Sequence, residues 1–264
     1  NTAVGRMALD ANTTGYSNVA VGKEALSGNT TGHRNVAIGL DALLVSNGTY
    51  NVAVGSYAMD ANTTGGNNVA VGMHALGQNT TASDNTAVGY GALTANTTGA
   101  GNAAFGKSAL TSLTTGSYNT AFGLEALDAL TTNSYNTAFG RQALSSATAG
   151  ENEAFGNRAA YAITTGSGNV CVGNHAGYNI TTGDNNTILG RFAAGDAGGT
   201  GNNMTADNNT AVGHYAGTQI TTGNNNAAVG AYALDANTTG FNNTALGAHA
   251  LGANTTAQDN TALG

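Results

Sequence analysis

The stretch Asn18–Arg34 reads NVAVGKEALSGNTTGHR and is one copy of a 17-residue unit that repeats along the chain. Its opening motif, Asn-x-Ala-Val-Gly, recurs in variant form sixteen times, and its glycine returns every 17 residues except for two intervals of 16 and one of 23. We number the positions of the unit from 1, the opening Asn, to 17. A fixed short period predicts a stack of coils, because one copy alone is too small to bury a core. The sequence therefore predicts an all-β solenoid, a parallel β-roll of about sixteen coils that occupies residues 1–264 as a single array.

Four positions of the unit hardly vary between copies. Position 1 is always Asn, position 5 is always Gly, position 4 is always apolar, and position 8 is Ala in every copy that extends that far. Adjacent strands of a sheet lie about 4.8 Å apart, so we expect the stacked Asn side chains to form a structural amide ladder. The ladder residues are Asn1, Asn18, Asn35, Asn51, Asn68, Asn85, Asn102, Asn119, Asn136, Asn152, Asn169, Asn186, Asn209, Asn226, Asn243 and Asn260.

Each unit contains two segments that are typical of strands. Positions 1–5 are short, β-branched and bounded by Asn and Gly, which predicts one strand, and the Ala-Leu pair at positions 8 and 9 predicts a second. The Asn-Thr-Thr-Gly group at positions 12–15 predicts a turn. We expect the position-4 residue, such as Val21, to face the interior. The Asn, Ala and Gly positions then form a small face, which either meets a partner chain or lets a very thin solenoid close on itself.

Two departures from the pattern are informative. In three coils the Leu at position 9 is replaced by a small residue while position 12 becomes Ile, which indicates that both positions fill one pocket. These pairs are Ala160 with Ile163, Gly177 with Ile180, and Gly217 with Ile220. The 23-residue interval predicts an insertion loop at about residues 195–208, either a plain surface excursion or a loop for ligand or lateral contacts. The loop contains Asp196, Gly198, Gly199, Thr200, Asn202, Asn203, Met204 and Asp207.

The composition excludes several classes of function. Charged residues are 8% of the chain and form no run of like sign, which excludes nucleic acid as a partner, because phosphate contacts need clustered Lys and Arg. The single cysteine, Cys171, excludes an intrachain disulfide and is expected to pack as a small hydrophobe. No stretch approaches the ~20 apolar residues of a membrane span, so we expect no membrane insertion by this segment. The array has no atypical capping coils, which favours a piece of a longer fibre or head-to-tail stacking.

In a stack, a catalytic or metal site needs complementary groups at neighbouring positions of adjacent coils. His74, His175 and His249 share position 7 but lie far apart in the array, so we expect surface histidines and no metal site. Acidic residues at position 10 are never in consecutive coils, so we expect solvated single carboxylates. They are Asp10, Asp60, Asp128 and Asp235.

One set of charges does stack in adjacent coils. Glu24 lies over Asp41 at position 7, and Arg6 lies over Lys23 at position 6, which predicts an exposed charge patch. Calcium-binding nonapeptides and the phosphate-loop and dinucleotide fingerprints are missing. We therefore expect no catalytic residues, no bound cofactor and no enzymatic activity.

The Asn-Thr-Thr-Gly turns suggest two further roles. Thr pairs such as Thr13 and Thr14 stack into a hydroxyl rank that is conceivable as an ice-binding surface, although neighbouring residues of an extended strand point to opposite faces. The turns also create Asn-x-Thr sequons, candidates for glycosylation, with plain turn chemistry and Thr-linked sugars as the alternatives. The sequons begin at Asn12, Asn29, Asn62, Asn79, Asn96, Asn237 and Asn254.

The Asn-x-Ala-Val-Gly-x-x-Ala units resemble the head repeats of trimeric autotransporter adhesins, and the 17-residue Asn-Thr-Thr-Gly form is similar to repeats of phage and bacterial tail fibres. The resemblance implies a left-handed parallel β-roll that assembles as a homotrimer and projects from a cell or virion surface for attachment. The repeat here is longer than in the adhesins, and the chain shows no coiled-coil stalk, neck or membrane anchor of that family.

These observations predict a structural, non-catalytic component of an extracellular fibre or stalk that associates with copies of itself, laterally or head to tail. One alternative is an adhesin or tail-fibre head that recognises a surface glycan. An ice-binding solenoid is a further alternative.

Overall fold

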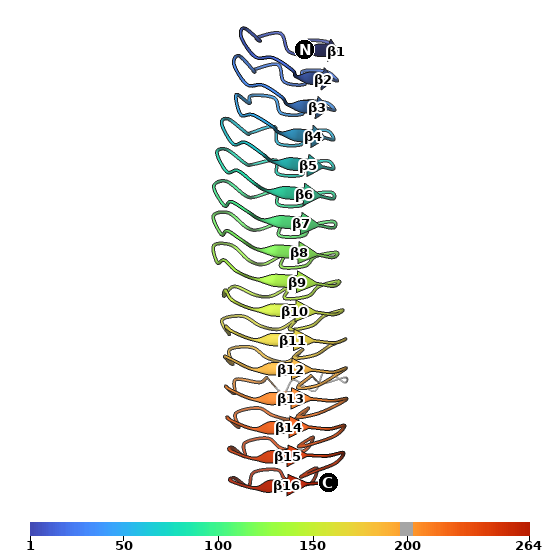
Figure 1. Ribbon diagram of the computed structural model, residues 1–264, viewed down its shortest axis with the longest axis vertical. Coiled ribbons are helices and arrows are strands. Elements are labelled where there is room, and N and C mark those ends of the chain that lie inside the picture. The colour runs from blue at the N-terminus through green and yellow to red at the C-terminus, as the bar shows by residue number, and fades with distance from the viewer. Residues whose placement is uncertain (196–202) are drawn as a thin grey trace. The chain divides into compact units, whose positions relative to one another are not determined.

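The computed structural model describes residues 1–195 and 203–264, and in this part of the chain it contains short strands and turns but no helix. The chain divides into two compact units, Asn1–Ser134 (unit 1) and Tyr135–Gly264 (unit 2). Figure 1 shows that each unit is a stack of coils with one strand per coil. The predicted all-β solenoid is therefore confirmed.

The strands follow the repeat, one for each Asn-x-Ala-Val-Gly motif. Unit 1 contains β1 (Thr2–Val4), β2 (Val19–Val21), β3 (Val36–Ile38), β4 (Val52–Val54), β5 (Val69–Val71), β6 (Thr86–Val88), β7 (Ala103–Phe105) and β8 (Thr120–Phe122). Unit 2 contains β9 (Thr137–Phe139), β10 (Glu153–Phe155), β11 (Val170–Val172), β12 (Thr187–Leu189), β13 (Thr210–Val212), β14 (Ala227–Val229), β15 (Thr244–Leu246) and β16 (Thr261–Leu263). Within each unit, every strand pairs in parallel with the next one along the chain, and equivalent residues lie opposite each other, as Val19 does with Val36.

The long interval between β12 and β13 leaves the ladder undisturbed, because Thr187 pairs with Thr210 in the usual register. The predicted insertion loop lies partly outside the described residues, which include neither Asp196, Gly198, Gly199, Thr200 nor Asn202. At its described end, Met204 forms a parallel bridge with Ile180 and its side chain is buried. This end of the predicted surface excursion is therefore part of the core.

The predicted second strand at positions 8 and 9 is wrong, because this part of each coil is a turn. The residues at positions 7 and 9 have left-handed backbone conformations, as in Glu24 (φ 58°) and Leu26 (φ 51°), which no strand contains. The turn is still bonded from coil to coil, because the Leu26 N–H donates to the Ala42 carbonyl at 3.0 Å.

The interior consists of Ala at positions 3 and 8 and of the Leu at position 9, so the prediction that position 4 faces inward is wrong. Ala20, Ala25 and Leu26 are fully buried, whereas Val21 is half-buried on the outer face of the sheet. The strand ends at Gly22, whose φ is 136°, and a Cβ atom there would lie 2.4 Å from the carbonyl oxygen of the next coil. The small residues therefore let a thin coil close on itself, the second of the two explanations considered for them.

Positions 9 and 12 share one pocket, as their exchange in sequence indicates. In one version the position-9 Leu is buried beside a buried Asn, as in Leu26 with Asn29. In the other version, a Cβ atom added at Gly217 would lie only 2.8 Å from Cδ1 of the buried Ile220. The isoleucine thus fills the space that a leucine side chain occupies in other coils.

Candidate functional site

The Asn residues at position 1, except Asn1 and Asn260, are buried, and the column bonds one coil to the next. The Asn35 backbone N–H donates to Oδ1 of Asn18 at 2.9 Å, and its own Oδ1 accepts the N–H of Asn51 at 2.9 Å. Its Nδ2 donates at 2.8 Å to the carbonyl of Gly48 and so ties the two ends of the coil together. Several of these amides also bond each other directly, as Asn186 Nδ2 does to Asn169 Oδ1 at 3.0 Å and Asn119 Nδ2 does to Asn102 Oδ1 at 3.2 Å. This column is engaged in stacking and offers no surface to a ligand.

A second Asn column, at position 12, contains the sequons. Five of the seven sequon asparagines are fully buried: Asn29, Asn62, Asn79, Asn96 and Asn237. Their side-chain amides donate to the position-15 residue of the same coil, as Asn79 Nδ2 does to the Ala82 carbonyl at 3.1 Å. A glycan on that nitrogen would have to replace this packing, which argues against glycosylation at these five residues. Asn12 and Asn254 are half-buried, and their amides donate in the same way.

The Thr residues at position 13 do not present a free hydroxyl rank. The Thr13 hydroxyl donates to the Thr30 carbonyl at 2.9 Å, and Thr63 and Thr238 repeat this bond to their following coils. These hydroxyls thus supplement the backbone ladder. Their engagement argues against the ice-binding alternative.

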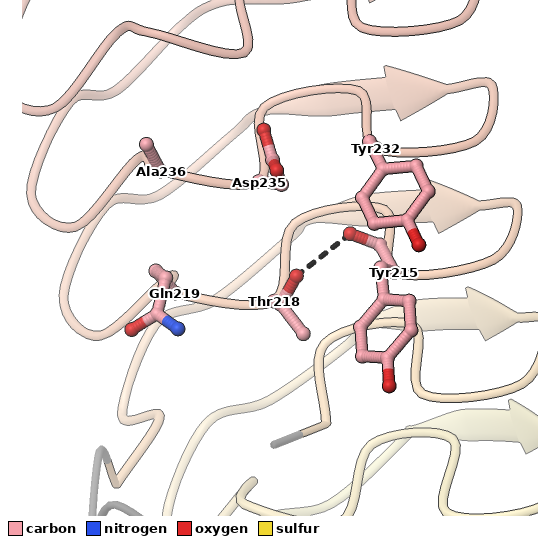
Figure 2. A pocket seen from close by; sticks show the side chains of 6 residues that line it. All are labelled: Tyr215, Thr218, Gln219, Tyr232, Asp235 and Ala236. Carbon is pink, nitrogen blue, oxygen red and sulfur yellow. Dashed lines mark hydrogen bonds between the residues drawn. The ribbon is translucent and has the colours of Figure 1, made fainter. Parts of the chain in front are cut away.

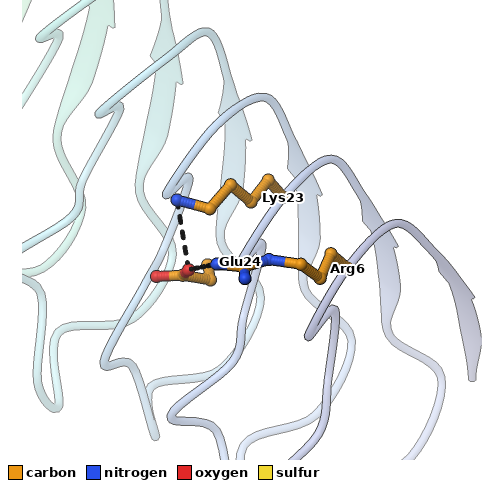
Figure 3. Close-up of polar contacts among 3 residues, drawn as sticks. All are labelled: Arg6, Lys23 and Glu24. Atoms are coloured by element: carbon orange, nitrogen blue, oxygen red, sulfur yellow. Dashed lines mark hydrogen bonds and ion pairs between the residues drawn. The ribbon is translucent and has the colours of Figure 1, made fainter.

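The predicted charge patch is present at Arg6, Lys23 and Glu24, as Figure 3 shows. Glu24 accepts from Arg6 at 3.0 Å and from Lys23 at 3.2 Å. The hydrogen bond from Lys23, together with the positive charges of Lys23 and Arg6, holds the pKa of Glu24 below its usual value. Asp41 does not join this cluster, and its Oδ1 is buried without a hydrogen-bond partner in the described chain. The arrangement is a surface ion pair and brings no reactive groups together.

The main feature that sequence reasoning missed is an aromatic column at position 7 of unit 2. His175, Phe192, Tyr215, Tyr232 and His249 come from consecutive coils, and their ring centroids are 5.2, 5.2, 5.3 and 5.1 Å apart. Two of the predicted lone surface histidines are thus the ends of a stack. Reading the residue two places after each anchor glycine, coil by coil, would have revealed it.

This column forms one wall of a groove with a volume of about 370 Å³. The lining residues are Tyr215, Thr218, Gln219, Tyr232, Asp235 and Ala236, at positions 7, 10 and 11 of two successive coils. Figure 2 shows the two tyrosine rings one above the other, with their hydroxyl groups pointing the same way. The Thr218 hydroxyl donates to the Tyr215 carbonyl at 2.7 Å, which fixes the turn beneath the rings.

Unit 1 contains a second copy of part of this arrangement. Tyr57 stacks on His74 with centroids 5.2 Å apart and 9° between the ring planes, compared with 5.1 Å and 1° for Tyr232 and His249. Asp60 follows Tyr57 in the same coil, as Asp235 follows Tyr232. Burial raises the pKa of Asp60 above its usual value. Of the position-10 carboxylates, Asp10 is exposed, whereas Asp60, Asp128 and Asp235 are half-buried.

Two further ionisable groups are perturbed by burial. Cys171 lies in β11 at position 3, where most coils have Ala, and burial raises the pKa of its thiol to about 12. It is an inert core residue, as expected for a small hydrophobe. Burial, followed by the charges of Arg158 and Arg191, lowers the pKa of His175.

Comparison with protein-family models, with curated proteins and with solved structures found no match for this chain. Over residues 1–195 and 203–264, no three His, Cys, Asp or Glu side chains come close enough together to hold a metal ion. In the same residues there is no helix of the length and hydropathy required to cross a membrane. Function must therefore be argued from the columns and the groove themselves.

Proposed function

We propose that this chain is a non-catalytic structural segment of a fibre or stalk on the outside of a cell or virion. The proposal depends on one observation: the invariant Asn at position 1 and the invariant Gly at position 5 serve contacts between coils. Positions 1, 12 and 13 form hydrogen bonds between coils, and the anchor glycines allow the close approach of successive coils. A sequence constrained mainly for stacking is what a structural element of repeated units requires. The extracellular location, left-handed winding and trimeric state are proposed from the resemblance to adhesin head repeats.

We further propose that the partner on the outer face of the sheet is a second copy of this chain. Position 4 puts large apolar side chains on that face in both units, and many of them are exposed. They include Val4, Ile38, Val71, Phe155, Leu189, Leu246 and Leu263, with exposed fractions between 37% and 75%. An apolar stripe of this kind marks an interaction surface. Because the stripe repeats with the coils of each unit, a parallel copy of that unit in the same register matches it strand by strand.

Sedimentation velocity and electron microscopy test this proposal. The full chain should sediment as an oligomer, and adding charge to the stripe with Phe155→Glu and Leu189→Glu should shift it to monomer while its circular dichroism stays β-type. A control pair, Asn174→Glu and Thr239→Glu, adds the same charge at exposed residues away from position 4 and should leave the oligomer intact. A parent chain that is monomeric at every concentration would refute lateral association. Filaments in micrographs of both pairs would show that assembly is head to tail instead.

The second candidate function, recognition of a surface glycan, is favoured by the groove beside Tyr215 and Tyr232. That groove includes no strand residue. Lateral assembly through the sheet and binding at the groove therefore use different surfaces.

A further inference from the structure

We propose that the groove beside Tyr215 and Tyr232 is a binding site for a neutral saccharide. Its volume of about 370 Å³ is near the lower end of the range of about 300–1,000 Å³ for small-molecule sites, which suits a mono- or disaccharide. The proposal rests on the second candidate function, recognition of a surface glycan, and is independent of the structural role, because a chain that forms no fibre would still contain the groove.

The aromatic wall of the groove is held rigid before any ligand arrives. Tyr215 stacks on Phe192 and Tyr232 stacks on His249, so each tyrosine is fixed by a ring in the adjoining coil. Tyr215 and Tyr232 are themselves 5.3 Å apart at their centroids, with 16° between the planes, which is an offset arrangement that leaves part of each ring uncovered. Both rings are half-buried. Such a wall can contact the C–H face of a sugar ring at little entropic cost, because its side chains are already ordered.

The charge of the groove disfavours anionic ligands. Asp235 is the only charged residue of the lining, and an anionic ligand would meet its carboxylate with no Lys or Arg to offset the repulsion. Among the described residues, no side chain or N–H group bonds this carboxylate. It lies over a glycine in the next coil, Gly252, where an added Cβ would come within 3.0 Å of its Oδ1. The carboxylate is thus an acceptor that lies close to a residue without a side chain.

Hydroxyl groups are the chemistry that matches all parts of this lining. An ionised carboxylate only accepts hydrogen bonds, whereas the tyrosine hydroxyls both donate and accept. Thr218 uses its hydroxyl proton on the Tyr215 carbonyl and therefore retains acceptor capacity toward the groove. A sugar hydroxyl can donate to Asp235 and accept from a tyrosine. An ammonium ligand can only donate, so it would leave the tyrosine donors unmatched.

The same combination recurs in unit 1, with one difference that helps the experiment. Tyr57, Asp60 and His74 repeat the order of Tyr232, Asp235 and His249. Asp60 also lies beside a glycine of the next coil, Gly77, where an added Cβ would be 3.5 Å from its Oδ1. Because this copy could bind a sugar as well, the groove of unit 2 is best tested in an Asp60→Asn background.

The test is saturation-transfer difference NMR followed by calorimetric titration of the full chain. The probes are the methyl glycosides of glucose, galactose, mannose and N-acetylglucosamine and the disaccharides built from them. N-acetylneuraminic acid serves as the anionic probe and tetramethylammonium as the cationic probe. We expect at least one neutral sugar to bind the Asp60→Asn chain, and we expect Asp235→Asn to weaken it at least about tenfold, as for loss of a hydrogen bond to a charged group.

Two further variants separate the site from its surroundings. Tyr232→Leu should also weaken binding, whereas Asp10→Asn, the same change at position 10 of a coil with no aromatic residue at position 7, should not. Circular dichroism melting must match the parent; if Tyr232→Leu fails to fold, Asp235→Asn decides alone. The proposal is overturned if no neutral sugar binds, if binding survives Asp235→Asn, or if only the anionic or only the cationic probe binds.

Discussion

Units 1 and 2 have the same coil geometry and differ in the side chains of two columns. At position 12, unit 1 has mostly Asn beside a position-9 Leu, as in Leu26 with Asn29, whereas unit 2 has several Ile residues beside Gly or Ala, as in Gly217 with Ile220. At position 7, unit 1 is mixed, whereas unit 2 carries five successive aromatic rings. The comparison shows that the coil requires a fixed total side-chain volume in its interior, whereas the side chains of the outer columns can vary. An outer column can therefore acquire a binding surface without a change of fold.

The largest effect should come from the feature that both units share. Gly22→Ala in unit 1 and Gly230→Ala in unit 2 each put a Cβ atom 2.3–2.4 Å from a carbonyl oxygen of the next coil, at φ values of 136° and 137°. We expect each to lower the free energy of unfolding by more than about 3 kcal/mol, because a strained backbone alone costs 1–3 kcal/mol. Urea titration followed by circular dichroism measures it.

Gly91→Ala is the matched control for these variants. Gly91 also has a positive φ, 65°, but its Cβ would meet only the Thr94 side chain at 3.4 Å. Alanine in this left-handed conformation should cost about 1 kcal/mol. Equal losses at Gly22 and Gly91 would show that backbone conformation, and not the approach of adjacent coils, constrains the anchor glycine.

The next largest effect tests whether the two ways of filling the interior pocket, Leu with Asn or Gly with Ile at positions 9 and 12, are interchangeable. Ile220→Asn alone puts an amide into an apolar pocket and leaves a cavity, which should destabilise unit 2 by about 3 kcal/mol. Gly217→Leu alone should clash with Ile220, because its Cβ would lie 2.8 Å from Cδ1. The double variant recreates the Leu and Asn pair of unit 1 and should recover most of both losses. A double-mutant cycle with no coupling would refute the shared pocket.

The repeat in the sequence predicts some features of the fold and leaves others open. The period determined the number of coils and the register, because only in-register stacking puts each Asn over the next. The period does not indicate which side of a three-residue strand faces the interior, because alternation defines two faces without ranking them. Size and hydropathy favour Val21 over Ala20 as the core residue, and the structure has the opposite arrangement. The left-handed residues Glu24 and Leu26 were invisible for a similar reason: neither residue type favours that backbone in isolation.

The candidate site was missed for a different reason. Positions that are constant in all coils reveal the shared coil structure. A site in a stack depends instead on variable positions in adjacent coils. Neither Tyr215 nor Tyr232 stands out within its own coil. The two rings form a wall only because one coil lies over the other. The role of Gly252, a half-buried glycine beside Asp235, likewise becomes clear only when adjacent coils are compared.

A smaller loss is expected from the position-1 column of asparagines. Asn102→Ala removes the acceptor of the Asn119 N–H and the donor to the Gly116 carbonyl, and it leaves both partners buried. We expect a loss of about 2 kcal/mol, since unsatisfied buried groups cost about 1–3 kcal/mol each and the partners can relax in part. Asn174→Ala, at an exposed residue whose side chain bonds the His175 ring, should change stability by less than about 0.5 kcal/mol. Similar losses of unfolding free energy in both variants would show that the position-1 column makes no special contribution to the stability of the stacked coils.

The smallest effect concerns the end of the aromatic column and depends on pH. Burial and the neighbouring Arg158 and Arg191 lower the pKa of His175 below its ordinary value of 6.5, and its ring lies against Tyr178 and Phe192. The unfolded chain therefore takes up this proton at a higher pH than the folded chain does. As the pH falls through about 6.5, the unfolded state gains more protons, and the free energy of unfolding decreases.

His175→Tyr keeps a ring in the column and removes the titration. We expect this variant to lose less stability than the parent between about pH 7.5 and about pH 5.5, when both are unfolded in urea. Tyr215→Phe changes the same column without removing an imidazole and should keep the pH dependence of the parent. If His175→Tyr and the parent lost stability equally, the proton on His175 would have no part in the acid sensitivity. His175 would then contribute to stability only as a ring packed against its neighbours.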